Sequence, residues 1–173
     1  MKALQILFIT MMSFIGVSVF AADELPDDEA LVQRISRAFA RSEDYADALI
    51  QVHSERGFIL LTGQVLNEEA RSQATNTVVF ASQDIRRIIN ELVVVSAVDD
   101  STAASDDALS AAIMAALTAA DEALAQKVQV VVHRNVAYLL GALTSDEQAL
   151  VGDRVSRVEG LASIRTGYEF VSE

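Results

Sequence analysis

The chain has 173 residues, of which 13 are Lys or Arg and 25 are Asp or Glu, so its formal net charge is −12. This acidity argues against nucleic acid as a partner, because phosphate binding needs clustered cations, and against simple electrostatic attraction to an anionic membrane surface. The lack of cysteine and the presence of only two histidines exclude disulfide frameworks, thiol nucleophiles and the commonest zinc sites, while 51% apolar residues are typical of a globular protein.

An apolar segment opens the chain. Residues 3–20 carry no charge, Lys2 precedes them, and Val19-Phe20-Ala21 fits the small-x-Ala pattern of a cleavage site. The segment is also near the length that spans a bilayer, so an uncleaved anchor is the alternative. We expect a signal peptide at residues 1–21. Export without cysteine favours a periplasmic location, and a cysteine-free cleavage site excludes a bacterial lipoprotein.

The rest of the chain repeats itself at an offset of 78 residues. Each copy begins with apolar residues spaced as one face of a helix, namely Leu31, Ile35, Ala38 and Phe39 in the first and Leu109, Ile113, Ala116 and Leu117 in the second. Asp27-Asp28 and Asp106-Asp107 precede these helices and suit N-caps and the positive end of the helix dipole.

A hairpin follows in each copy. The strands alternate over residues 50–55 and 128–133, turn at Arg56-Gly57 and Arg134-Asn135, and return over residues 58–65 and 136–143. A second helix then begins near Asn67 or at a Ser145–Gln148 capping box. The last strands cover residues 88–95 and 164–171, with two extra residues in the first copy near residues 81–84.

This pattern predicts an α+β protein with two tandem αββαβ modules. Each module has a three-stranded mixed sheet with two helices on one face. We place the modules at residues 27–96 and 105–173, joined by a linker at residues 97–104 that is rich in small and polar residues.

Three glycines have structural roles in this scheme. Gly57 belongs to the first turn, and pairing about that turn sets Ile50 opposite Gly63 and Val52 opposite Leu61. We interpret Gly63 and its equivalent Gly141 as points where a helix approaches the sheet closely, and a β-bulge is the alternative.

The sheet face away from the helices is too apolar to remain exposed to solvent. It carries candidate contacts for a partner or lipid, which we expect to be buried between the two modules or against another protein: Phe58, Leu60, Val131, Tyr138 and Leu140. The alternative is that these are isolated exposed apolar residues, which are common.

The second copy's first helix provides another candidate surface. Residues 108–120 carry no charge, and Ala111 and Met114 lie off the core-facing stripe. Such a helix can dock on a partner or a lipid interface. An Ala-rich helix favoured by intrinsic propensity is the alternative.

No residue pattern indicates catalysis, a cofactor, a metal site or a small-molecule substrate. His53 and His133 are not equivalent in the repeat and lack the further ligands that a metal needs. Acidic pairs such as Glu68-Glu69 stand at helix starts, where the dipole favours them. We expect a protein that is not an enzyme.

The hairpin sequence resembles the BON domain. Residues 50–65 read I-x-V-x-x-x-x-G-x-x-x-L-x-G-x-V, and the second copy follows with Val128, Val130, Asn135, Leu139, Gly141 and Leu143. The Gly-Val that usually precedes the last strand is Asp84-Ile85 in the first copy and Gly160-Leu161 in the second.

The resemblance implies a non-enzymatic periplasmic protein of Gram-negative bacteria, similar to osmotically inducible tandem-BON proteins and to outer-membrane-associated relatives. It implies support of envelope integrity or of the stress response through binding of phospholipid or of envelope proteins. A periplasmic chaperone or protein-interaction adaptor is the alternative.

Overall fold

The computed structural model describes residues 26–172, so the predicted signal peptide lies outside the described residues. Module 1 (residues 27–96) contains these elements: α1 (Asp28–Arg41), a 3-10 turn η1 (Glu43–Tyr45), β1 (Leu49–Glu55), β2 (Phe58–Val65), α2 (Glu68–Ala81), β3 (Arg87–Asn90) and β4 (Val93–Val94). Module 2 (residues 103–172) contains α3 (Ala103–Ala120), α4 (Glu122–Ala125), β5 (Val128–His133), β6 (Val136–Leu143), α5 (Ser145–Val155) and β7 (Ser163–Phe170).

The predicted fold class is confirmed: each module is an αββαβ unit with a mixed sheet. β1 and β5 pair antiparallel with β2 and β6, which pair parallel with β3 and β7 on their other edges. The register sets Ile50 opposite Gly63 and Val52 opposite Leu61, as predicted. Ile59 pairs with Ile88, whereas its equivalent Ala137 pairs with Ile164, which confirms the two extra residues in module 1.

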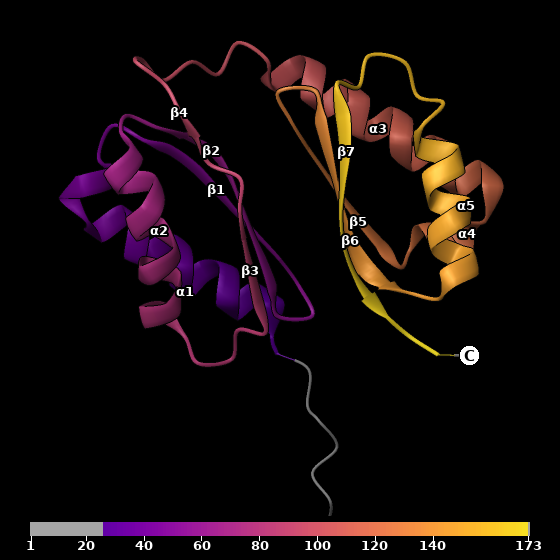
Figure 1. The fold of residues 1–173 in the computed structure, drawn as a ribbon, viewed down its shortest axis with the longest axis horizontal. Helices are drawn as coiled ribbons and strands as arrows, with labels where there is room; N and C mark the ends of the chain where they lie inside the picture. The colour runs from indigo at the N-terminus through magenta and orange to yellow at the C-terminus, as the bar shows by residue number, and fades with distance from the viewer. Residues whose placement is uncertain (1–25, 173) are drawn as a thin grey trace, which may run out of the picture.

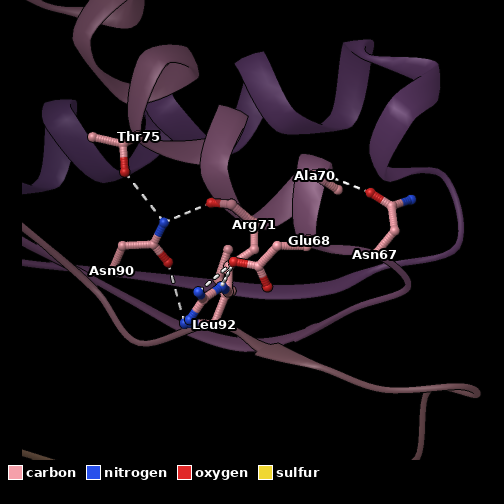
Figure 2. A network of polar contacts seen from close by, with 7 residues as sticks. All are labelled: Asn67, Glu68, Ala70, Arg71, Thr75, Asn90 and Leu92. Atoms are coloured by element: carbon pink, nitrogen blue, oxygen red, sulfur yellow. Dashed lines mark hydrogen bonds and ion pairs between the residues drawn. The ribbon is translucent and has the colours of Figure 1, made fainter.

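A short irregular segment interrupts the last strand of module 1. The Asn90 side chain donates to the Arg71 carbonyl (2.7 Å) and the Thr75 hydroxyl (3.2 Å) of α2, and accepts from the Leu92 backbone N–H (3.2 Å) (Figure 2). The chain therefore leaves β3 at Asn90 and resumes pairing with β2 at Val93. The side chain of Leu92 is buried in the core.

A carboxylate from the first helix fixes each hairpin turn. Asp28 accepts from the Arg56 and Gly57 backbone N–H groups at 2.6 and 2.9 Å. Its repeat equivalent Asp106 accepts from Arg134 and Asn135, both at 2.8 Å. All four turn residues have positive φ, as a type I′ turn requires.

The expectation that the acidic pairs cap the helices holds only in part. Asp27 is the N-cap of α1 and accepts from the Ala30 N–H. α3 instead begins at Ala103, so Asp106 lies in its first turn and serves the hairpin. The capping box also lies one residue earlier than the predicted Ser145–Gln148 pair, because Thr144 and Glu147 form it.

The interpretation of Gly63 and Gly141 as sites of close helix approach is wrong. A Cβ at Gly63 would lie 1.9 Å from the Leu49 carbonyl oxygen of the antiparallel neighbour strand. A Cβ at Gly141 would lie 2.2 Å from the Lys127 carbonyl oxygen. The space that the missing side chain leaves is therefore occupied by neighbouring backbone.

Each module has its own core between the sheet and its helices. In module 1 the buried stripe of α1 (Leu31, Ile35 and Phe39) and that of α2 (Ala70, Ala74 and Val78) pack on Ile59, Leu61 and Val65 of the sheet. The equivalent core of module 2 contains Ile113, Leu117, Leu139, Leu143, Val151 and Val155. The two sheets lie in the middle of the molecule, with helices on both outer sides (Figure 1).

The segment between the modules is attached to β2. The buried Gln64 amide donates to the Asp99 carbonyl (2.5 Å) and accepts from the Asp99 N–H (2.9 Å). Between residues 26 and 172, no helix has the length and hydropathy that crossing a membrane requires.

Candidate functional site

The faces of the two sheets that carry no helices pack against each other. Leu60 of β2 and Val131, Tyr138 and Leu140 of module 2 form one buried cluster, with Ile89 and Val136 packed against it. Burial raises the pKa of Tyr138 to about 12. Four of the five apolar candidates of the open sheet faces therefore lie between the modules, where they contact each other.

Gly167 shapes this interface. A Cβ there would lie 2.7 Å from Leu140 Cδ2 and 2.8 Å from Ile89 Cδ1. A side chain at this position of β7 would therefore force the ends of the Leu140 and Ile89 side chains to move. No sequence pattern pointed to this glycine, because its neighbour Ile89 comes from the other module.

The fifth candidate, Phe58, lies at the border of the interface and is half-buried. The Arg86 guanidinium stands over its ring, 5.9 Å from the ring centroid. This distance is within the range of a cation–π contact. Phe58 is thus shielded by a charged side chain of its own module.

Ion pairs join the modules at both ends of the interface. Glu169 near the end of β7 pairs with Arg56 (2.9 Å) and Arg86 (3.0 Å), and Arg165 near the start of β7 pairs with Glu91 (3.1 Å) after β3. The start of β3 therefore lies near the end of β7, and the two strands run in opposite directions. The hydrogen bond from Arg56 lowers the pKa of Glu169, and the charge of Arg86 lowers it further.

The two histidines meet at the same interface. Burial lowers the pKa of His53, and the nearby His133 lowers it further. Burial also lowers the pKa of His133, with Arg134 adding to this effect and Asp106 and Asp100 opposing it. Among residues 26–172, neither Nε2 atom has a hydrogen-bond partner.

These histidines do not form a metal site with their neighbours. In the part of the chain that the structure describes, no three His, Asp or Glu side chains gather in a way that could hold a metal ion. Asp106, the carboxylate that acts on His133, already accepts two backbone hydrogen bonds from the hairpin turn. The pair instead lies outside the apolar cluster, among polar and charged side chains that include Asp106 and Arg134.

The acidic pairs at helix starts have structural partners. Glu68 forms an ion pair with Arg71 in the next turn of α2, and Glu69 accepts from the Gln73 amide. Together with Asp27 and Asp28, they stabilise helix starts or turns.

The outer side of α3 is lined by small residues. Ala111 is exposed, whereas Met114 is half-buried and packs against the module 2 core. The two residues therefore do not form one exposed patch. The free surface of this helix consists of alanine methyl groups and short polar side chains.

The largest exposed apolar side chains lie elsewhere. Phe80 is 88% exposed and Val79 is 53% exposed, at the C-terminal end of α2, and Phe170 is 66% exposed at the end of β7. None of these three residues is among the contacts predicted from the sequence. A signal was present, because Val79 and Phe80 are large apolar residues that lie outside the Ala70, Ala74 and Val78 stripe.

Comparisons with known proteins point to one family. The BON domain model matches residues 27–96 and 105–167, which together make up most of the chain. The outer membrane lipoprotein DolP of Haemophilus influenzae is 22% identical over 146 residues, covering 84% of this chain and 75% of that protein.

Solved structures add only a weak likeness. Two structures of CdsD, a structural protein of the type III secretion system of Chlamydia trachomatis, share 16% identity and a TM-score of 0.34. The alignments cover 86% and 87% of this chain but 66% and 70% of those chains. This overlap is too low to inform the fold or the function.

Proposed function

The chain belongs to the BON-domain family, and from this premise we propose that it is a non-enzymatic periplasmic protein that supports the bacterial envelope, including under osmotic stress, by binding phospholipid surfaces or envelope proteins. The observation that carries the proposal is the presence of two complete BON modules that account for nearly all of residues 26–172. A relative described as an outer membrane lipoprotein supports an envelope location.

The arrangement of side chains supports a binding role over a catalytic one. Of the carboxylates that stood out in the sequence, Asp27 caps a helix, Asp28 and Asp106 hold hairpin turns, and Glu68 pairs with Arg71. The two histidines lie near the junction of the modules, where His53 lines a cavity with Gln51 and Asp106. These groups are committed to structure, so contact with a partner must come from other surfaces.

The packing of the two sheets against each other reduces the surface that is left for contact with a partner. Leu60, Val131, Tyr138 and Leu140 are buried in one cluster between the two modules. The apolar sheet faces that suggested a chaperone or adaptor are therefore occupied in this structure. We assign partner contact to the helices and to the edges of the two-sheet sandwich.

Vesicle flotation with the full chain tests the lipid branch of this proposal. The chain should float with vesicles of phosphatidylethanolamine and phosphatidylglycerol and should be recovered from the periplasm or the envelope of cells. Failure to float with both anionic and phosphatidylcholine vesicles would remove phospholipid as the partner. Photo-crosslinking from position 111 on α3 then tests for an envelope protein.

A further inference from the structure

A cavity lies between the two modules, beside the buried cluster where the sheets meet. It has a volume of about 350 Å³ and is lined by residues of β3 and β7, the strands that face each other between the modules in Figure 1. Its inner wall is apolar, because Leu60 and Leu140 are buried there and Ile89 packs against them. Cavities that bind small molecules are common between domains and have volumes of about 300–1,000 Å³, so this one has room for a small organic ligand.

One buried side chain of the cavity wall has an unpartnered hydroxyl. Tyr138 is only 6% exposed, yet its hydroxyl forms no hydrogen bond with any residue between 26 and 172. The charges that act on this hydroxyl are those of Glu91 and Arg165, which line the cavity as well. Because burial raises the pKa of Tyr138 to about 12, the phenol keeps its proton and is available as a hydrogen-bond donor to a ligand.

Two arginines line the outer part of the cavity. Side chains alternate between the faces of a strand, so Arg87 lies on the same face of β3 as Ile89. Arg87 is exposed and forms no ion pair with any residue that the structure describes. The side chain of Arg165 is 59% exposed, and one of its nitrogens pairs with Glu91 at 3.1 Å. The cavity therefore passes from an apolar inner wall to guanidinium groups near the solvent.

The charges of the cavity wall favour a ligand with a single negative charge. Two arginines and one glutamate line the cavity, and Arg165 already neutralises the glutamate. The next carboxylate on the same face of β7 is Glu169, which two other arginines share, so it does not neutralise Arg87. One guanidinium without a counter-ion matches a carboxylate better than a doubly charged phosphate monoester.

We propose that this cavity binds a small monocarboxylic acid with an apolar body. The apolar body packs on Leu60, Ile89 and Leu140, while the carboxylate accepts a hydrogen bond from the Tyr138 hydroxyl and pairs with the Arg87 guanidinium. Because both modules contribute to the site, the bound acid also stabilises their contact. The site is separate from the outer surfaces to which the proposed function assigns contact with phospholipid or envelope protein.

Titration of the ¹⁵N-labelled protein with benzoate, followed by the backbone amide signals, locates the site. Benzoate should move the signals of Ile89, Leu140 and Gly167 with a Kd on the order of 1 mM, as is usual for so small a ligand. The signals of Ser72 on α2 and Ala111 on α3, which are exposed on the helix layers, should not move. Benzyl alcohol lacks the charge, acetate lacks the ring and benzylamine has the opposite charge, so each should bind about tenfold or more weakly than benzoate.

Substitutions test the two donors. Tyr138→Phe keeps the ring in the cluster between the sheets and removes only the hydroxyl, so it should weaken benzoate binding by about tenfold. Tyr168→Phe is the matched control, because its ring packs against the module 2 core outside the cavity, and it should leave binding unchanged. Arg87→Gln should weaken binding by roughly fivefold. Arg157→Gln, which removes an exposed arginine that pairs with Asp153, should have no effect.

The outcomes separate this inference from the proposed function. Benzoate that moves no signal, or only signals away from the cavity, would overturn the site. Benzylamine that binds as tightly as benzoate would overturn its preference for an anion, and unchanged affinity in Tyr138→Phe and Arg87→Gln would overturn the two donors. A chain that floats with vesicles but does not bind benzoate loses this site and keeps the proposed function. A chain that binds benzoate without floating keeps the site and loses the lipid branch.

Discussion

Arg56 and Glu169 are 113 residues apart in sequence, yet the Arg56 Nε atom donates to the Glu169 carboxylate at 2.9 Å. Arg56 belongs to the first hairpin turn and Glu169 to β7 of the other module. Arg86 joins the same carboxylate. The three side chains form a polar clamp at one end of an otherwise apolar contact between the sheets.

Replacing Glu169 by Gln should weaken this clamp. We expect the free energy of unfolding to fall by about 1 kcal/mol, because two arginines lose one partly exposed carboxylate. The lowered pKa of Glu169 means that this stabilisation is present above the ordinary pKa of 4.5 and is lost as pH falls through the lowered value. Urea unfolding across this pH range checks both statements. Asp153→Asn, which breaks an exposed ion pair with Arg157 just beyond α5, is the control and should cost less.

A charge in the inter-sheet cluster should separate the modules. Leu60→Asp places a carboxylate among Val131, Tyr138 and Leu140. Burying a charge among these apolar side chains costs free energy, because they cannot replace its hydration. We expect small-angle scattering to show a larger radius of gyration while circular dichroism keeps the secondary structure of both modules. Leu66→Asp, at an exposed position after β2, should change neither signal. An unchanged radius in Leu60→Asp would contradict the packing described here.

Two glycine-to-alanine substitutions should have opposite effects. Gly63→Ala forces a Cβ into the Leu49 carbonyl oxygen at a positive φ of 121°, so we expect a loss of about 3 kcal/mol or more. Gly152 lies in α5 with nothing within 4 Å of an added Cβ. Gly152→Ala should therefore stabilise the chain by roughly 0.5–1 kcal/mol through helix propensity. Thermal melts of the two variants give the comparison directly.

The histidine pair should make stability depend on pH. Both pKa values are lowered in the folded state, so the unfolded chain binds protons first and stability falls as pH drops through about 6.5. Stability levels off once pH is below the lowered values. His53→Val introduces the residue that occupies the equivalent position 131 of module 2. This variant should flatten the pH profile of the melting temperature, and a profile as steep as that of the wild type would refute the role of His53.

Local sequence patterns were sufficient for the fold of each module. Alternation in the hairpin strands and the turn residues Arg56-Gly57 fixed the register, which the pairing of Val52 with Leu61 confirms. The apolar stripes of the helices were equally clear, because Leu31 and Ile35 lie on the same side of α1 and are both buried in the core. Both signals act over a few residues and are therefore visible without the tertiary structure.

Contacts between distant segments were not accessible in the same way. Asp106 looks like a helix cap in sequence, but it binds backbone groups 28 and 29 residues later. The reason for Gly63 is not visible in the local sequence, because the Leu49 carbonyl that fills its space lies in another strand. The open sheet faces were recognised as apolar, but whether the other module or a separate protein covers them depends on docking geometry that no local pattern encodes.

The Gln64 amide shortens the linker between the two modules. Because it holds Asp99 against β2, only residues 100–102 separate this attachment from the start of α3. Because this linker is short, each module meets the other at an effective concentration of roughly millimolar, whatever the abundance of the protein in the cell. Reunion after a transient opening is therefore unimolecular and independent of dilution, and another copy of the chain competes poorly for either sheet.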